Sequence, residues 1–181
     1  MFWKRRLRRR NSRHKAPSKV TGLLVLVVLF NCPVARADKV SELQAHFDKE
    51  AHATTKIRIL DKLAEAQFEV ASKADTDGDY VTVGLTFEKY RDNIRVAFEL
   101  LRKQEPDAER HPGGYRQLEL QARKGIREVE QTIIVVAPEL RPPLEIVHKD
   151  LLATDDELIQ LLFPKHLKEP LKVPPPGEDK P

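Results

Sequence analysis

Cysteine is almost absent from this 181-residue chain, in which Cys32 is the only one. Cys32 also falls within an N-terminal segment that we expect to be removed. Disulfides, zinc–cysteine sites and cysteine nucleophiles are therefore excluded together for the remaining chain. Stability must come from an apolar core, and the remaining residues are numerous enough to bury one without covalent cross-links.

Acidic residues are absent from the first 37 positions, which carry ten basic residues. The rest of the chain has 22 basic residues against 28 acidic ones, so the pI of about 9.2 reflects the N-terminal segment. A mildly acidic domain offers no broad positive surface to a polyanion. We therefore expect no nucleic-acid partner.

The N-terminal apolar run is also short: it covers residues 20–30, whereas a membrane-spanning helix needs about 20 apolar residues. A basic segment precedes the run, and Ala35 and Ala37 follow it at the two small-residue positions of a signal peptidase site. The pattern predicts a secretory signal peptide over residues 1–37, cleaved before Asp38. We expect the product to be periplasmic or secreted.

Two other fates of the leader stay open. An uncleaved leader would hold the protein at the membrane as an anchor. Lipid attachment is the second alternative, because Leu29 lies three residues before Cys32, as in a bacterial lipobox. Asn31 departs from that pattern, which has a small residue before the cysteine. The leader suits a bacterial envelope, and a eukaryotic secretory route is a further alternative.

Helical periodicity dominates residues 54–163, and no run alternates as a half-buried strand would. Four amphipathic helices are expected, separated by turns rich in glycine, proline and aspartate. Their inward positions are Ile57, Leu60, Ala64, Phe68 and Ala71; Val83, Phe87, Tyr90, Ile94, Ala97 or Phe98, and Leu101; Tyr115, Leu118, Ala122, Val129, Ile133 and Val136; and Leu144, Val147, Leu151, Leu158, and Leu161 or Leu162.

The breaks between these helices predict two helical hairpins. The turn formers at 75–79 divide the first pair, and residues 105–114 separate the pairs. The fold class is therefore all-α, an antiparallel helical bundle of about four helices. The last helix can instead restart at Thr154, where Thr154 and Glu157 have the spacing of a capping box.

Segments flank this helical domain on both sides. Residues 38–53 form a polar entry segment that can hold a short helix using Leu43 and Phe47. Residues 164–181 are rich in proline and charge, which predicts a disordered or extended tail. Such a tail can be a solvated end, a spacer or a docking peptide.

The first hairpin locally resembles a tetratricopeptide unit. The resemblance is carried by Ala71 at the close-packing position and by Gly78, Tyr80 and Phe87 around the turn and second helix. No second copy follows at a 34-residue period, and a solenoid needs stacked repeats. We therefore read the match as shared hairpin packing and predict no repeat array.

Two groups of residues are metal-ligand candidates. Asp75, Asp77 and Asp79 bring three carboxylates together, as Ca²⁺ requires, but the closing position of a calcium loop falls on Gly84. The same aspartates also suit a turn and a helix N-cap. Glu145 and His148 share a helical face as in di-iron bundles, where a second such pair is needed and none occurs here. We expect neither a metal nor another cofactor.

Catalytic signatures are equally scarce. The only serines after residue 37 are Ser41 and Ser72, neither in a nucleophile elbow, and no phosphate-binding glycine loop occurs. By elimination we expect a non-catalytic protein-interaction or scaffold module of the cell envelope, with another envelope protein as partner. The alternatives are a carrier of a small ligand or metal, and a carboxylate-based hydrolase using residues such as Glu128, Glu130 and Asp155.

Overall fold

The computed structural model of the protein describes residues 34–164, with side chains described from Lys39 onward. Cys32 and residues 165–181, which hold nearly all of the expected tail, lie outside this part. The expected cleavage positions Ala35, Ala37 and Asp38 belong to the start of the first described helix. Residues 36–164 belong to one compact unit, and the description that follows concerns this unit alone.

Every regular element in residues 34–164 is helical, as expected from the sequence. The elements are α2 (Val34–Lys49), α3 (Ala53–Asp77), α4 (Tyr80–Gln104), α5 (Pro112–Val135), the short 3₁₀ turn η1 (Pro138–Leu140) and α6 (Arg141–Leu162).

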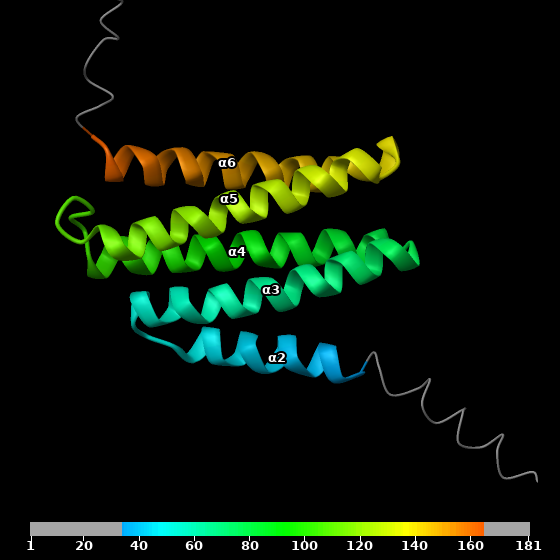
Figure 1. Cartoon of the computed structure of the whole chain (residues 1–181), viewed down its shortest axis with the longest axis horizontal. Coiled ribbons are helices and arrows are strands. Elements are labelled where there is room, and N and C mark those ends of the chain that lie inside the picture. Colours follow the sequence, from blue (N-terminus) through cyan, green and yellow to red (C-terminus); the bar gives the residue numbers. More distant parts are fainter. Residues whose placement is uncertain (1–33, 165–181) are drawn as a thin grey trace, which may run out of the picture. The chain divides into compact units, whose positions relative to one another are not determined.

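The four longest helices pack as two antiparallel pairs (Figure 1). α3 pairs with α4 and α5 pairs with α6, while α4 also contacts both helices of the second pair. Both hairpin turns, α3–α4 and α5–α6, lie at the same end of the helices, which we call the turn end. α2 lies along the outer side of α3.

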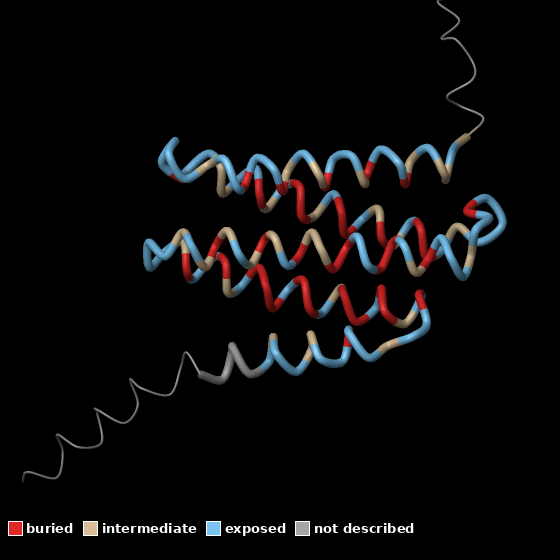
Figure 2. The backbone as a smooth tube through the Cα atoms, turned by 180° about the vertical axis from the view of Figure 1, so that it is seen from behind, coloured by how far each residue is buried: buried red, intermediate tan, exposed pale blue. Residues whose placement is uncertain are grey.

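The core forms where these helices face one another, and buried positions recur along their facing sides (Figure 2). All the inward positions expected from periodicity are buried, except that Ile133, Leu161 and Leu162 are only partly buried. This confirms the assigned faces, because a helix rotated by half a turn would have exposed them. α2 is present as well, and its Phe47 is 1% exposed.

Two helix boundaries differ from the expectation. α3 continues to Asp77, into the turn formers at 75–79, because no residue before Gly78 forbids helical backbone. Gly78 then adopts φ 75°, a conformation that favours glycine, and ends the helix. α5 begins at Pro112, inside the expected loop, with proline in its first turn.

The alternative restart of the last helix at Thr154 is wrong. α6 runs without a break to Leu162, and the Thr154 hydroxyl donates to the Asp150 carbonyl within the helix. The hydroxyl is therefore already engaged and does not cap a new helix. Asp155 lies on the buried face, next to Arg123 of α5.

Candidate functional site: a cleft between the hairpins

The largest hollow near the turn end lies between α3 and α5. Two adjoining cavities of about 780 and 250 Å³ share Phe68, Ser72 and Glu128, and we call them together the hairpin cleft. Its remaining lining residues are Glu65, Glu69, Ala71, Lys73, Asp75, Thr76, Asp77, Phe87, Lys124, Gln131, Thr132 and Val135. One wall therefore comes from each hairpin.

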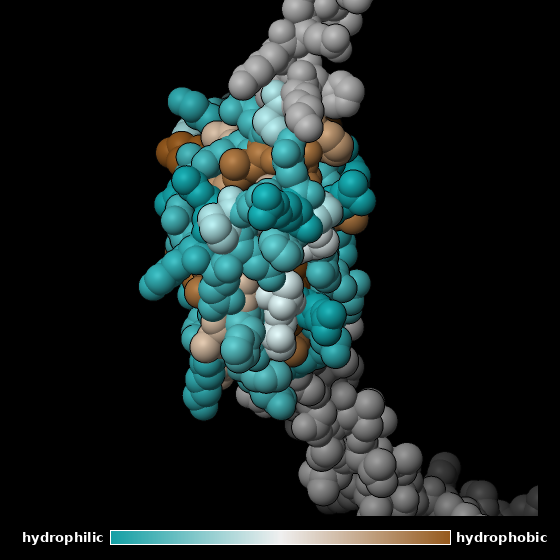
Figure 3. All heavy atoms as spheres, turned by 90° about the vertical axis from the view of Figure 1, so that its left-hand side faces the viewer, coloured by the Kyte–Doolittle hydropathy of each residue, from teal (hydrophilic) through white to brown (hydrophobic). Residues whose placement is uncertain are grey.

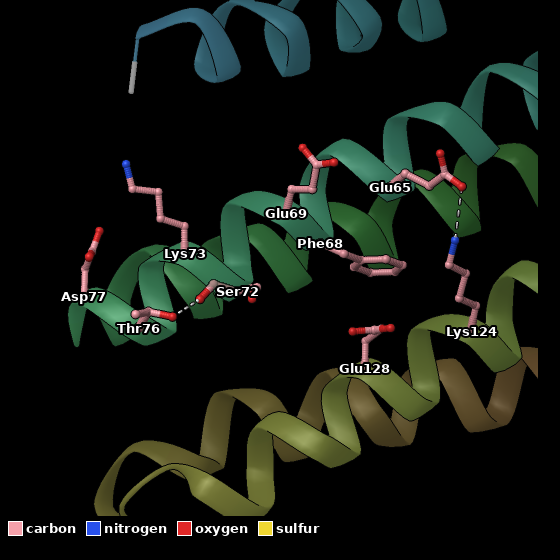
Figure 4. Close-up of a pocket in the computed structure, with 9 residues that line it drawn as sticks. All are labelled: Glu65, Phe68, Glu69, Ser72, Lys73, Thr76, Asp77, Lys124 and Glu128. Atoms are coloured by element: carbon pink, nitrogen blue, oxygen red, sulfur yellow. Dashed lines mark hydrogen bonds and ion pairs between the residues drawn. The ribbon is translucent and has the colours of Figure 1, made fainter. Parts of the chain in front are cut away.

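Aromatic packing forms the base of the cleft. The Phe68 ring lies between the two walls (Figure 4) and packs 4.8 Å from the Tyr90 ring and 6.1 Å from the Phe87 ring, centroid to centroid. Tyr90 is fully buried, and its hydroxyl donates to the Gln121 carbonyl of α5 at 2.6 Å. The base therefore contacts both hairpins.

Negative charge predominates in the cleft. Its lining includes five carboxylates, those of Glu65, Glu69, Asp75, Asp77 and Glu128, but only two lysines. Lys124 is engaged within the cleft, because its Nζ lies 3.7 Å from Glu65 Oε1 and 5.7 Å from the centre of the Phe68 ring. The cleft therefore offers uncompensated carboxylates to anything that enters it.

Exposed aliphatic side chains gather at the same end of the molecule. Ten large hydrophobic residues are exposed among the described residues, and six of them lie within about two helical turns of the turn end. These six, the turn-end aliphatics, are Val81, Leu85, Ile134, Val135, Leu140 and Ile146. Val135 also lines the cleft, so the apolar surface continues into it.

The opposite end of the molecule is mostly polar. Viewed from there, hydrophilic residues cover most of the surface, and the largest hydrophobic area lies near the top of the view (Figure 3). A smaller hollow occurs at this end between the α4–α5 loop and the end of α6, with Pro106, Ala108 and Leu161 in its lining. Its lining is also acidic, with Asp107 and Glu109 and no basic residue, but it has fewer carboxylates than the hairpin cleft and no aromatic base.

The structure separates the three aspartates that suggested a calcium loop. Asp75 and Asp77 belong to the last turn of α3 and line the cleft. Asp79 instead caps α4, accepting from the Thr82 backbone N–H at 3.1 Å and from its hydroxyl at 2.6 Å. These two hydrogen bonds lower the pKa of Asp79. No group of three or more metal-ligating side chains occurs within residues 34–164.

His148 is engaged by α5 and has no recorded hydrogen bond or ion pair with Glu145. His148 Nε2 lies 2.9 Å from Glu130 Oε1 of α5, while Glu145 is exposed. The carboxylates considered for hydrolysis are likewise engaged separately: Glu128 lines the cleft and Asp155 lies 3.6 Å from Arg123. The structure thus places these residues in different surroundings.

Sequence reasoning missed Glu65 and Glu69 as residues of the cleft. A signal was present, because two like charges four residues apart on one helical face destabilise an isolated helix. Such a pair on α3 indicates that this face of the helix has a role other than stabilising the helix. Lys124 carried no comparable signal, since its contact with Glu65 exists only once α5 packs beside α3.

No protein-family model matches the chain, and no curated protein or solved structure is significantly similar to it. Within residues 34–164, no helix has both the length and the apolarity that a membrane crossing requires. Function is therefore inferred from the chemistry of the described surface.

Proposed function

We propose that the protein is an exported, non-catalytic interaction module of the cell envelope, built as a small helical bundle, that holds a segment of another envelope protein in the hairpin cleft. One observation carries this proposal. An acidic cleft with an aromatic base adjoins exposed aliphatic side chains, and both occur at the turn end. Exposed apolar surface beside a groove is typical of protein-binding sites.

The cleft favours a basic partner segment. Glu65 lies on the α3 wall and Glu128 on the α5 wall, so a lysine or arginine between the walls would meet a carboxylate from each side, whereas Glu69 and Asp77 point away from α5 (Figure 4). Charge pairs across an interface mainly steer association and select partners. The same charges disfavour nucleic acid and acidic proteins.

Apolar contact would supply most of the affinity. Leu85 is 61% exposed and Val135 is 64% exposed, so a partner could remove much of each side chain from water. Burying one such side chain contributes about 1.5–3 kcal/mol. Two or three of them would offset only part of the cost of association, about 4–15 kcal/mol, so the charge pairs and the rest of the bound segment must contribute as well.

The proposal is tested by co-purification from the native envelope through a tag on residues 165–181, with mass spectrometry of the captured proteins. Leu85→Asp and Val135→Asp should each reduce the yield of a stoichiometric basic partner at least tenfold. Leu120→Asp is the matched control, because Leu120 is 62% exposed but is neither a turn-end aliphatic nor part of the cleft lining.

Equal capture by all variants would contradict the assignment of the cleft. The same data test export through the N-terminal peptide of the captured chain. A chain that begins at Asp38 supports a cleaved leader, whereas one that retains residues 23–30 contradicts it.

A further inference from the structure

Lys124 reaches across the hairpin cleft, from its place on α5 to the α3 wall. Its Nζ lies 3.7 Å from Glu65 Oε1 and 5.7 Å from the centre of the Phe68 ring (Figure 4). A cation of one hairpin therefore rests against a carboxylate and an aromatic ring of the other. The Glu128 carboxylate, on the same wall as Lys124, points toward the same ring. We call Glu65, Phe68 and Glu128 together the cation seat.

Lys124 is held only weakly in this seat. A separation of 3.7 Å is that of an ion pair without a hydrogen bond. The Lys124 side chain is 32% exposed and that of Glu65 is 63% exposed. An exposed pair of this kind contributes little to stability, because water screens the charges and two long side chains must be ordered. Displacing Lys124 from the seat therefore costs the folded protein little.

An arginine suits the seat better than a lysine does. Its guanidinium group is planar, donates through five N–H groups in a fixed fork and stacks on aromatic rings, whereas an ammonium group acts as a compact point charge. A guanidinium can therefore pair with Glu65 while its face lies against Phe68, and Glu128 adds negative charge from the opposite wall. The seat favours an incoming arginine over the resident lysine.

We propose that Lys124 is a built-in placeholder for an arginine of the partner segment, which displaces it from the cation seat on binding. The proposal rests on the proposed function, because it names the residue that anchors a basic segment in the hairpin cleft. Competition with Lys124 penalises every incoming cation, so a segment binds well only if its cation interacts with the seat more strongly than a lysine. Lys124 is thus a specificity-determining residue.

The test uses three synthetic pentapeptides that differ only in the central residue, which is arginine, lysine or citrulline, the uncharged analogue of arginine. Each is titrated into the full chain, as the cell processes it, by nuclear magnetic resonance, which measures dissociation constants into the millimolar range. The native chain should bind the arginine peptide at least threefold more tightly than either of the others. Lys124→Ala should tighten binding of the arginine peptide about fivefold, the upper range for an exposed ion pair. Binding of the citrulline peptide should not change.

Lys73→Ala is the matched control. Lys73 also lines the cleft, but its side chain points away from α5 (Figure 4), so the substitution removes the same charge without touching the seat. It should change each dissociation constant less than twofold. Equal effects of the two lysine substitutions, equal affinity of the native chain for the arginine and citrulline peptides, or no saturable binding to any chain would overturn the proposal.

The outcome separates the role of Lys124 from the proposed function. Val135→Asp should abolish binding of the arginine peptide if the cleft is where it binds, because Val135 lines the cleft. An arginine peptide that needs Val135 but is affected equally by both lysine substitutions would overturn the placeholder role and leave the cleft assignment supported.

Discussion

At the scale of single residues, Gly125 explains how closely the two hairpins approach. A Cβ atom at this position would overlap the Tyr90 ring, which is fully buried at the contact between α4 and α5. We expect Gly125→Ala to lower the free energy of unfolding by about 1–3 kcal/mol, the usual cost of overpacking a core. Urea denaturation followed by circular dichroism measures this change.

Gly84 is the matched control for this substitution. It also lies within a helix, but a Cβ atom there would meet no other atom within 4 Å. Gly84→Ala should therefore raise the free energy of unfolding by about 0.5–1 kcal/mol, because it removes backbone freedom from the unfolded chain. Similar effects of the two substitutions would show that helix propensity, and not the approach to Tyr90, explains Gly125.

Asp155 gives a prediction for pH dependence. Burial raises the pKa of its carboxyl group, and Arg123 only partly offsets this effect. The native state therefore binds the proton more tightly than the unfolded state, and stability falls as pH rises from the unfolded pKa of about 3.9 through the native pKa. Asp155→Asn should accordingly be more stable than the native protein at neutral pH.

The stability difference between the two proteins should shrink as the pH approaches about 4, where Asp155 becomes protonated. Thermal unfolding at a series of pH values measures it. A variant that is less stable than the native protein at neutral pH would show that the ion pair with Arg123 outweighs the cost of burying Asp155.

At the scale of whole helices, the sequence predicted the buried faces better than the helix ends. Faces follow from the spacing of apolar residues, and every residue expected to face inward on α3 and α4 is buried, although the fully buried Leu63 was not among them. Helix ends depend on local competition between helical and turn conformations. The run from Asp75 to Asp77 looks like a turn, yet it stays helical until Gly78, where a positive φ becomes possible without strain.

The attachment of α2 is an element-scale property that can be tested through Phe47. Phe47→Ala removes the one fully buried side chain among residues 39–49 of α2, and a core phenylalanine truncation typically costs about 3–5 kcal/mol. We expect α2 to detach locally, with amide hydrogen exchange strongly accelerated across residues 40–49 and little changed in α4 to α6. His46→Ala, at an exposed neighbouring position, should leave exchange unaltered. Uniform acceleration across all helices would show that α2 is an integral part of the cooperative unit.

At the scale of the whole molecule, the hairpins are joined by a core and bordered by ion pairs. Asp150 of α6 accepts from Arg91 and Arg95 of α4 at 3.3 Å, and Arg102 pairs with Glu157 at 2.8 Å. These side chains are partly exposed, so each pair is expected to contribute about 0–1 kcal/mol. The apolar core therefore sets the stability of the fold.

Salt should consequently act differently on folding and on binding. Raising sodium chloride from 0.05 to about 0.5 M shortens the screening length to a few ångströms, which weakens attraction between the acidic cleft and a basic partner. We expect the melting temperature to change little and the partner's dissociation constant to rise at least tenfold, as measured by calorimetry and surface plasmon resonance. A complex insensitive to salt would contradict charge recognition in the cleft.

The cleft itself could not have been predicted from the sequence. Its walls come from residues about 60 positions apart, such as Glu65 and Lys124, and their separation depends on how the hairpins diverge toward the turn end. Helical spacing gives the face of each residue but not the angle between helices. Asp75 and Asp77 were considered as metal ligands only because they lie close together in sequence with Asp79, and their position beside α5 in the cleft lining carries no signal in the sequence.

Photo-crosslinking in living cells is the sharpest test of whether the hairpin cleft binds a basic segment of an envelope protein. A photoreactive phenylalanine analogue replaces Val135 at the lip of the cleft or, in a second strain, Leu120, which is equally exposed and does not line the cleft. If the cleft binds such a segment, we expect a specific adduct at Val135, joined to a lysine- or arginine-rich segment of one envelope protein, and none at Leu120. No adduct at Val135, or the same adduct at both positions, would contradict it.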